Sequence, residues 1–210
     1  MERSVWLAKN LMIAGIAVGI GIFAWELPSS AWAQTRLPEE TEQHRWSFSP
    51  GRIELGAQIG GGFSLAENSR EATEFAFLPR IGYVFAQQEH FLPGSFEIVG
   101  EPAFLTVFQH ETVYVGAVAA LLKYNFRTGT RWTPYLVGGA GLSFASHRLP
   151  QGGTNFNFMP EGGVGLHYAI TPRSLLGVEW RFQHFSNADI SPPNPGLNMS
   201  LFLLGYSVVY

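Results

Sequence analysis

The sequence contains no cysteine and little charge, since only 14% of its 210 residues are Asp, Glu, Lys or Arg. Without cysteine, an exported chain cannot use disulfides to stabilise itself. The formal net charge of −3 gives no support to nucleic-acid binding, which needs a basic surface. After residue 25 the chain also lacks a long apolar run that could form a membrane helix. Any membrane role of that part must depend on strands or on the surface.

The residues that are abundant are glycine, with 24 copies, and the aromatic residues, which make up 14% of the chain. A composition that is rich in both but poor in charge is typical of transmembrane β-strands rather than of a helical domain. The length is that of one domain. The composition thus indicates a single all-β domain.

The amino terminus has the pattern of an export signal. Arg3 and Lys9 precede an apolar run over residues 11–25, and the small-residue pattern Ala31-Trp32-Ala33 follows. This order predicts a secretory signal peptide over residues 1–33 with cleavage after Ala33, and the alternative is a membrane-anchoring helix. Residues 34–50 are polar, and we expect them to form a poorly ordered periplasmic lead. Residues 51–210 would then form the folded domain.

From residue 52 onward the side chains alternate between apolar and polar. The first apolar face begins with Ile53 and Leu55 and the first polar face with Glu54, which is the period of a strand. Similar runs predict strands over residues 52–65, 75–85, 96–108, 113–126, 135–144, 156–168, 175–186 and 198–210. Strands of this length can cross a bilayer when tilted. We expect a bulge at Pro79 and turns at residues 66–70, 127–132, 146–154 and 170–174.

Eight such strands predict an antiparallel transmembrane β-barrel in the outer membrane. In hydrocarbon every backbone amide needs a partner within the protein, so the sheet must close. The last strand alternates up to the aromatic terminal residue Tyr210, which looks like the terminal signature of bacterial outer-membrane barrels. A soluble calycin-like barrel is the alternative, and it would place the apolar face inward.

A barrel of eight strands is too narrow for a pore, so its own side chains fill the lumen. Buried charges need partners, and the polar positions therefore predict an internal paired network. Its expected members are Arg52, Glu54, Gln58, Glu97, Glu101, Lys123, Glu161, His167, Glu179, Arg181 and Gln183.

The seventh and eighth strands place polar residues at the extracellular rim, where the seventh ends and the eighth begins. In the seventh strand the parity of the lipid-facing Trp180 and Phe182 continues into His184 and Ser186. In the eighth strand, counting back in steps of two from the carboxyl terminus reaches Asn198. We expect these three polar side chains to point outward, unless a bulge after Phe182 turns the pair inward.

The spacing of His184 and Ser186 allows nucleophilic chemistry. Residues i and i+2 of a strand are roughly 6.5 to 7 Å apart, a distance that a histidine side chain can span. An imidazole can take the serine proton as attack begins, and a third group on the far ring nitrogen holds the tautomer. The alternative is that these polar residues only mark the headgroup boundary. Phe182 and Phe185 could line an acyl groove or act as interfacial anchors.

The segment from His184 to Gly196 resembles the corresponding segment of the outer-membrane lipid A 3-O-deacylases of the PagL type. The similarity is carried by His184-Phe185-Ser186-Asn187-Ala188, followed by Pro193-Asn194 and Gly196. The resemblance implies a serine esterase on the outside of a barrel that removes the acyl chain at position 3 of lipid A.

By the same resemblance each polar residue of the loop has an expected role. Ser186 would be the nucleophile, His184 the general base and Asn198 the third member of the triad. Asn187 and Asn194 would shape the loop and the oxyanion site. No metal or other cofactor is implied.

Two positions depart from the family pattern. Asn198 stands where the family has glutamate, so it can orient the imidazole but offers no charge to the imidazolium. Asp189 stands where the family has glycine, and it adds a negative charge near the oxyanion or serves as a substitute acid.

The expected partners are an acylated membrane lipid as substrate and the outer-membrane bilayer. A homodimer is an open alternative, and no nucleic acid is expected. Two other functions remain open: a non-enzymatic barrel for adhesion, surface protection or membrane anchoring, and a phospholipase that uses the same exterior groove.

Overall fold

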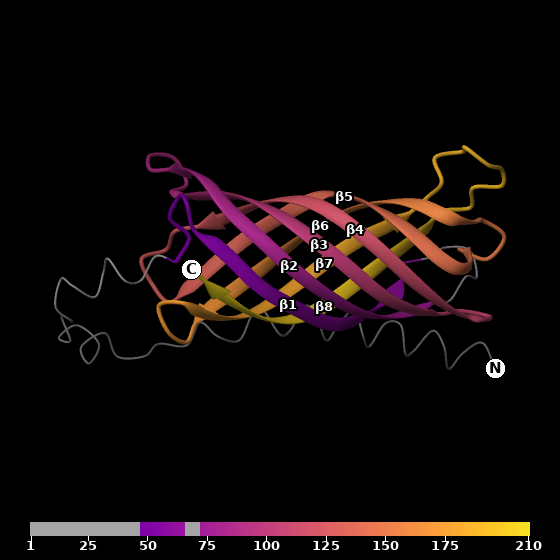
Figure 1. Ribbon diagram of the computed structural model, residues 1–210, viewed down its shortest axis with the longest axis horizontal. Coiled ribbons are helices and arrows are strands. Elements are labelled where there is room, and N and C mark those ends of the chain that lie inside the picture. The colour runs from indigo at the N-terminus through magenta and orange to yellow at the C-terminus, as the bar shows by residue number, and fades with distance from the viewer. Residues whose placement is uncertain (1–46, 66–71) are drawn as a thin grey trace, which may run out of the picture. The chain divides into compact units, whose positions relative to one another are not determined.

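The computed structural model describes residues 47–65 and 72–210, which form a closed barrel of eight antiparallel strands in sequence order (Figure 1). The strands are β1 (Ile53–Ser64), β2 (Thr73–Gln88), β3 (Gly94–Phe108), β4 (Thr112–Phe126), β5 (Trp132–Leu149), β6 (Thr154–Ala169), β7 (Ser174–Phe185) and β8 (Leu197–Val209). The predicted eight-stranded barrel is confirmed. The expected signal peptide, most of the lead and the turn at 66–70 lie outside the described residues. The described ranges include no helix that is long and apolar enough to span a membrane.

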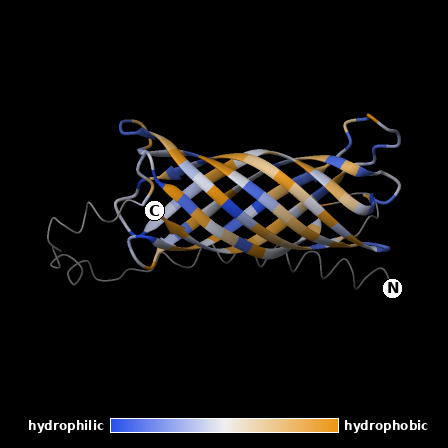
Figure 2. Ribbon diagram, viewed as in Figure 1, coloured by the Kyte–Doolittle hydropathy of each residue, from blue (hydrophilic) through white to orange (hydrophobic). Residues whose placement is uncertain are grey.

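The barrel has an apolar exterior, and its interior holds buried charged and polar side chains together with an apolar cluster. Phe75, Ile81, Phe104, Phe202 and Leu204 are all exposed on the outside, and Figure 2 shows hydrophobic and hydrophilic residues alternating along the strands. A soluble barrel would place its apolar face inward and its charges in water. The opposite arrangement is the one that a bilayer solvates, so the calycin-like alternative is wrong.

Closure is made between the first and last strands, which pair from Glu54–Val209 to Ser64–Met199. An unpaired sheet edge in hydrocarbon would leave several backbone groups without partners. The terminal strand also points its aromatic residues outward, because Tyr206 and Tyr210 are both exposed.

The predicted bulge at Pro79 is wrong. The β2–β3 register is the same at Phe77–Phe104 and at Ile81–Gly100, and it shifts only between Val84 and Ala86. Proline removes a backbone donor but inserts no residue, so it leaves the register intact.

The turn predicted at residues 146–154 is shorter than expected. The pairing of β5 with β6 shifts register after Phe144 and resumes with Leu149–Thr154, which leaves only residues 150–153 outside the strands. Asn157 supports this end, because its Nδ2 donates to the carbonyl of Leu149 over 2.8 Å. This β5–β6 hairpin lies beside the β7–β8 loop (Figure 1).

The lumen holds the expected ionic network. Arg181 is the hub, with Nη1 2.5 Å from Glu101, Nη1 3.1 Å from Glu161 and Nη2 2.6 Å from Glu179. Nearer the end of the barrel where β1 begins, Lys123 Nζ lies 2.5 Å from Glu54 and 3.2 Å from Glu97. Pairing of this kind is what makes buried charges tolerable.

The network differs from the prediction at three residues. Arg52 precedes β1 and is exposed, so it is not a lumen residue. Arg80 and Glu74 are buried inside although neither was predicted, and Arg80 bonds Glu101. Both residues occupy inward-facing positions of β2. The alternation of apolar and polar residues along this strand was therefore enough to predict them.

The expectation that the whole lead is poorly ordered is wrong for its last part. Phe48 is fully buried with Lys123 Nζ 4.9 Å from its ring centroid, and Ser47 Oγ donates to the carbonyl of Pro172 over 2.9 Å. The aromatic ring of Phe48 therefore closes the lumen at the end of the barrel where β1 begins. A cation–π contact and apolar burial both favour this position.

Candidate active site

The candidate site lies where β7 ends and β8 begins, at the end of the barrel opposite the carboxyl terminus (Figure 1). The side chains along β7 alternate without interruption, so Gln183 and Phe185 are buried while Phe182 is exposed. His184 and Ser186 are half-buried and have the outward parity. The register of β7 and β8 is continuous up to Phe185–Leu197, and no bulge turns the pair inward.

The buried position of Phe185 corrects one expectation. Its ring has no exposed surface and packs with Leu197 and Met199 in the apolar part of the lumen. It therefore cannot line an acyl groove or anchor the rim, whereas Phe182 still can. Packing on the inner side of the strand end holds the outward neighbours in place, because interiors are close-packed.

His184 and Asn198 are directly opposite each other on β7 and β8. Their Nδ1 and Oδ1 atoms are 2.6 Å apart. An amide oxygen can only accept, so Nδ1 carries a proton, and in the neutral imidazole the lone pair is then on Nε2. This is the tautomer that a general base needs.

Gly196 lies against the histidine ring. A Cβ at this position would be 3.2 Å from His184 Cε1, and the backbone has φ +63°, which favours glycine. The imidazole therefore leaves little room for a side chain at position 196.

The hydroxyl of Ser186 accepts two hydrogen bonds from the β7–β8 loop and donates one to Asn194 Oδ1 over 3.2 Å. Asn194 Nδ2 lies 2.9 Å from Ser186 Oγ, and the backbone N–H of Ala188 donates to the same oxygen over 3.1 Å. The predicted contact with His184 is not among the hydrogen bonds of Ser186 in the described part of the chain. Nucleophile–base hydrogen bonds are often loose without substrate, so the spacing along the strand still allows this pairing.

Asn187 holds the loop and does not face the exterior. It is 2% exposed, its Nδ2 donates to Ser191 O over 2.7 Å and to Thr154 Oγ1 over 3.2 Å, and its Oδ1 accepts from Asp189 N over 2.9 Å. Of the two asparagines expected to shape the site, only Asn194 presents a donor to Ser186. Thr154 was not predicted, and no local signal in the sequence points to it.

Two consecutive residues of this loop have left-handed backbone conformations. Ala188 has φ 53° and Asp189 has φ 60°. Residues with a Cβ adopt such conformations at a cost, and they persist where the surroundings hold them. The conformation points the Ala188 N–H at Ser186 Oγ.

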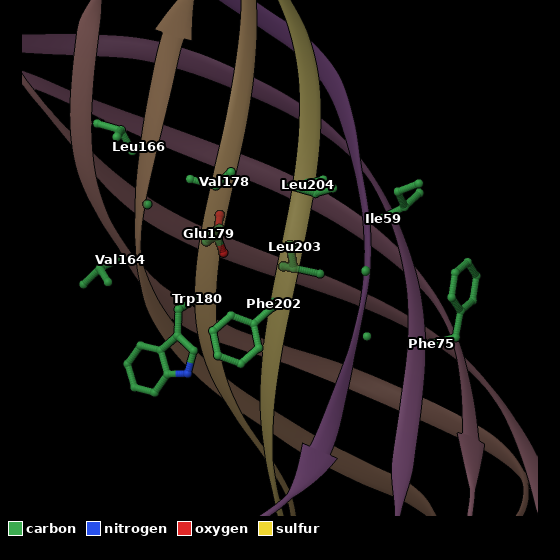
Figure 3. Close-up of a pocket in the computed structure, with 13 residues that line it drawn as sticks. Ile59, Phe75, Val164, Leu166, Val178, Glu179, Trp180, Phe202, Leu203 and Leu204 are labelled. Atoms are coloured by element: carbon green, nitrogen blue, oxygen red, sulfur yellow. The ribbon is translucent and has the colours of Figure 1, made fainter. Parts of the chain in front are cut away.

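An apolar groove of about 900 Å³ lies on the exterior of the same strands (Figure 3). It is lined by Ile59, Gly60, Gly61, Phe75, Val164, Gly165, Leu166, Val178, Glu179, Trp180, Phe202, Leu203 and Leu204. Trp180 and Phe202, which pair across β7 and β8, lie side by side in the close-up. The indole N–H of Trp180 donates to Ser200 Oγ over 2.9 Å, which satisfies its polar atom in an apolar surface.

The described residues hold no group of three or more His, Asp or Glu side chains that could bind a metal ion. The chemistry available at this site is that of a hydroxyl, an imidazole, two carboxamides and a backbone amide.

A closed eight-stranded antiparallel barrel with an apolar exterior defines the class of outer-membrane β-barrel proteins. The family model for lipid A 3-O-deacylase (PagL) matches residues 19–207. The chain belongs to this family, and it is an outer-membrane protein.

Individual relatives agree with this assignment. The lipid A deacylase PagL of Bordetella bronchiseptica is 35% identical over 92 residues, which are 41% of this chain and 47% of the relative. The match thus spans about half the length of that protein. The crystal structure of the outer membrane enzyme PagL superposes with a TM-score of 0.57 at 17% identity, over 72% of this chain and 97% of that one. Neisserial surface protein A gives 0.54 at 18% identity, over 75% and 98%. At these identities the two structures share the fold.

Proposed function

We propose that the protein is a lipid A deacylase, which hydrolyses the ester-linked acyl chain at position 3 of lipid A in the outer leaflet. The observation that carries this proposal is the His184–Asn198 contact of 2.6 Å on the lipid-facing side of the strand that leads into Ser186. Polar side chains are costly on such a surface, so three together favour a function. Membership of the family supplies the substrate and the bond.

The reaction would follow the route of serine esterases. Ser186 Oγ attacks the acyl carbonyl carbon while His184 Nε2 takes the hydroxyl proton. The carbonyl oxygen becomes an oxyanion, and we assign its stabilisation to the amide of Asn194 and the N–H of Ala188, which both bond Ser186 Oγ. Collapse breaks the bond to the sugar oxygen, which His184 protonates. Water then hydrolyses the acyl-serine by the same steps.

Asn198 takes the place of an acidic third member. Its Oδ1 holds the Nδ1–H tautomer, which is the orienting part of the role. It supplies no negative charge to the imidazolium that forms during attack, so the transition state lacks the ion pair that a carboxylate would form. We infer a functional triad that is slower than one with a carboxylate.

The exterior groove gives the acyl chain a place to lie. It extends along β7 and β8 from the Trp180–Phe202 pair. On the outward faces of these strands, Trp180 is four residues before His184 and Phe202 is four residues after Asn198. An acyl chain on this surface exchanges lipid contacts for protein contacts, and its ester would reach the rim. The homodimer remains a prediction. The proposed site does not require one, because one chain supplies every residue named above.

The test is mass spectrometry of lipid A from cells that express the wild type, Ser186→Ala or His184→Ala. Loss of one 3-linked hydroxyacyl chain with the wild type, but with neither Ser186→Ala nor His184→Ala, supports the proposal. Ser174→Ala and His110→Ala are matched controls, because Ser174 begins β7 at the opposite end and His110 lies in the β3–β4 loop. Unchanged lipid A in every strain would favour a non-enzymatic barrel, and release of fatty acid from phospholipid alone would favour a phospholipase.

A further inference from the structure

Thr154, the first residue of β6, lies in the β5–β6 hairpin and contacts the neighbouring β7–β8 loop. Its Oγ1 lies 3.2 Å from Asn187 Nδ2, across 33 positions of sequence. The two segments are also joined by the backbone, since Phe158 and Ser186 exchange hydrogen bonds of 2.7 and 3.1 Å. The β5–β6 hairpin thus forms one wall of the proposed active site.

The orientation of the Asn187 amide is set by two acceptors of its NH₂ group, the carbonyl of Ser191 at 2.7 Å and the hydroxyl of Thr154. The single proton of this hydroxyl is used toward the carbonyl of Phe156, 2.7 Å away. The oxygen can therefore only accept from Asn187, which requires the NH₂ group of that amide on this side. The amide oxygen is then directed to the backbone N–H of Asp189, 2.9 Å away.

This orientation stabilises the strained part of the loop. Asn187 Oδ1 binds the N–H of Asp189, which has φ 60°, and Asn187 N donates to Asn194 Oδ1 over 3.1 Å. With its oxygen bound there, Asn194 turns its NH₂ group to Ser186 Oγ. Left-handed residues are maintained only where their surroundings over-determine them, and Thr154 belongs to those surroundings.

Thr154 is itself held firmly. Asn157 is 1% exposed, and its Nδ2 donates to the carbonyls of Leu149 and Thr154 over 2.8 and 3.3 Å. A buried amide that bonds both sides of the hairpin end fixes its geometry. A series of contacts therefore connects the β5–β6 hairpin to Ser186.

We propose that Thr154 is a positioning residue for the reaction at Ser186, acting through Asn187 on the two oxyanion donors. The proposal rests on the proposed function. Thr154 touches neither the substrate nor the reacting atoms, and it fixes where the donors point. Its loss would leave the apolar groove unchanged, so substrate binding should be maintained while the chemical step slows.

The test compares Thr154→Val with Thr154→Ser in the purified full barrel, folded in detergent micelles with lipid A as substrate. Thr154→Val should lower kcat about five-fold or more with KM unchanged, because a buried donor of Asn187 loses its partner. Thr154→Ser should restore most of kcat, since it keeps the hydroxyl. Amide hydrogen exchange over residues 186–196 should be faster in the valine variant alone.

Thr171→Val is the matched control. Its Oγ1 accepts from the backbone N–H groups of Arg173 and Ser174 over 3.3 and 2.9 Å in the β6–β7 turn, at the other end of the barrel. It should retain wild-type kcat and wild-type exchange in the loop.

Two outcomes would overturn the role of Thr154: wild-type kcat and exchange in Thr154→Val, or an equal loss in Thr154→Ser. If the wild type itself leaves lipid A intact, the proposed function fails, and the exchange measurement still decides whether Thr154 holds the loop. Should Thr154→Val not fold, Thr154→Ala takes its place in the same comparison.

Discussion

His184 and Asn198 form a cross-strand pair at the end of the β7–β8 ladder, with Nδ1 and Oδ1 2.6 Å apart. Directly opposed side chains on one face of a sheet are the closest neighbours that two strands offer. The register of β7 and β8 therefore fixes the tautomer of the histidine. The following predictions concern this pair, the loop beside it and the groove along the same strands.

Replacing Asn198 tests its place in the triad. Asn198→Glu should raise kcat by up to about ten-fold, because a carboxylate stabilises the imidazolium as well as orienting it. Asn198→Leu should lower kcat by about 100-fold or more, since the tautomer is no longer held. Steady-state kinetics with lipid A in micelles measure both. A complete loss in Asn198→Glu would argue against Asn198 as the third member.

Replacing Asp189 separates charge from backbone strain. Asp189→Asn removes the negative charge near the oxyanion but keeps the Cβ, and Asp189→Gly also relieves the φ 60° conformation. We expect both variants to raise kcat, the glycine variant at least as much as the asparagine variant. The kinetic assay decides, and a decrease in Asp189→Asn would identify Asp189 as the substitute acid.

Gly196→Ala should lower kcat by displacing the imidazole. The added Cβ would lie 3.2 Å from His184 Cε1. Gly129→Ala is the matched control, because Gly129 has a similar φ of 69° in the β4–β5 turn with no heavy atom within 4 Å of its Cβ position. Both variants should lose about 1 kcal/mol of stability, measured by thermal unfolding, since both place a Cβ at positive φ. Equal activity in the two would show that Gly196 acts on the backbone alone.

Filling the groove should impair binding of the acyl chain. Val178 lines the groove and is 50% exposed, so Val178→Trp should fit the lipid face and raise KM for long-chain substrates with a smaller effect on short-chain ones. Val118→Trp is the control, because Val118 on β4 is also exposed but lies outside the groove. A KM series over acyl-chain length measures the effect. The same KM values in both variants would place the acyl chain elsewhere.

Much of the fold was predictable because the bilayer imposes a simple pattern. The eight strands, the outward apolar face and the outward parity of His184 and Ser186 all follow from a period of two along each strand. Two predictions failed: the bulge at Pro79, where a local feature was given too much weight, and the disorder of the whole lead, because the burial of Phe48 depends on distant partners. The roles assigned to the catalytic residues remain predictions.

The sequence by itself determined which residues face lipid and which line the lumen, because alternation is a local property of the chain. Only the tertiary structure decided which distant residues lie beside the β7–β8 loop. Thr154 meets Asn187 across 33 positions, and the His184 ring leaves little room for a side chain at Gly196. The groove combines residues of five strands. Contacts of this kind depend on barrel closure and strand register, which no single stretch of sequence encodes.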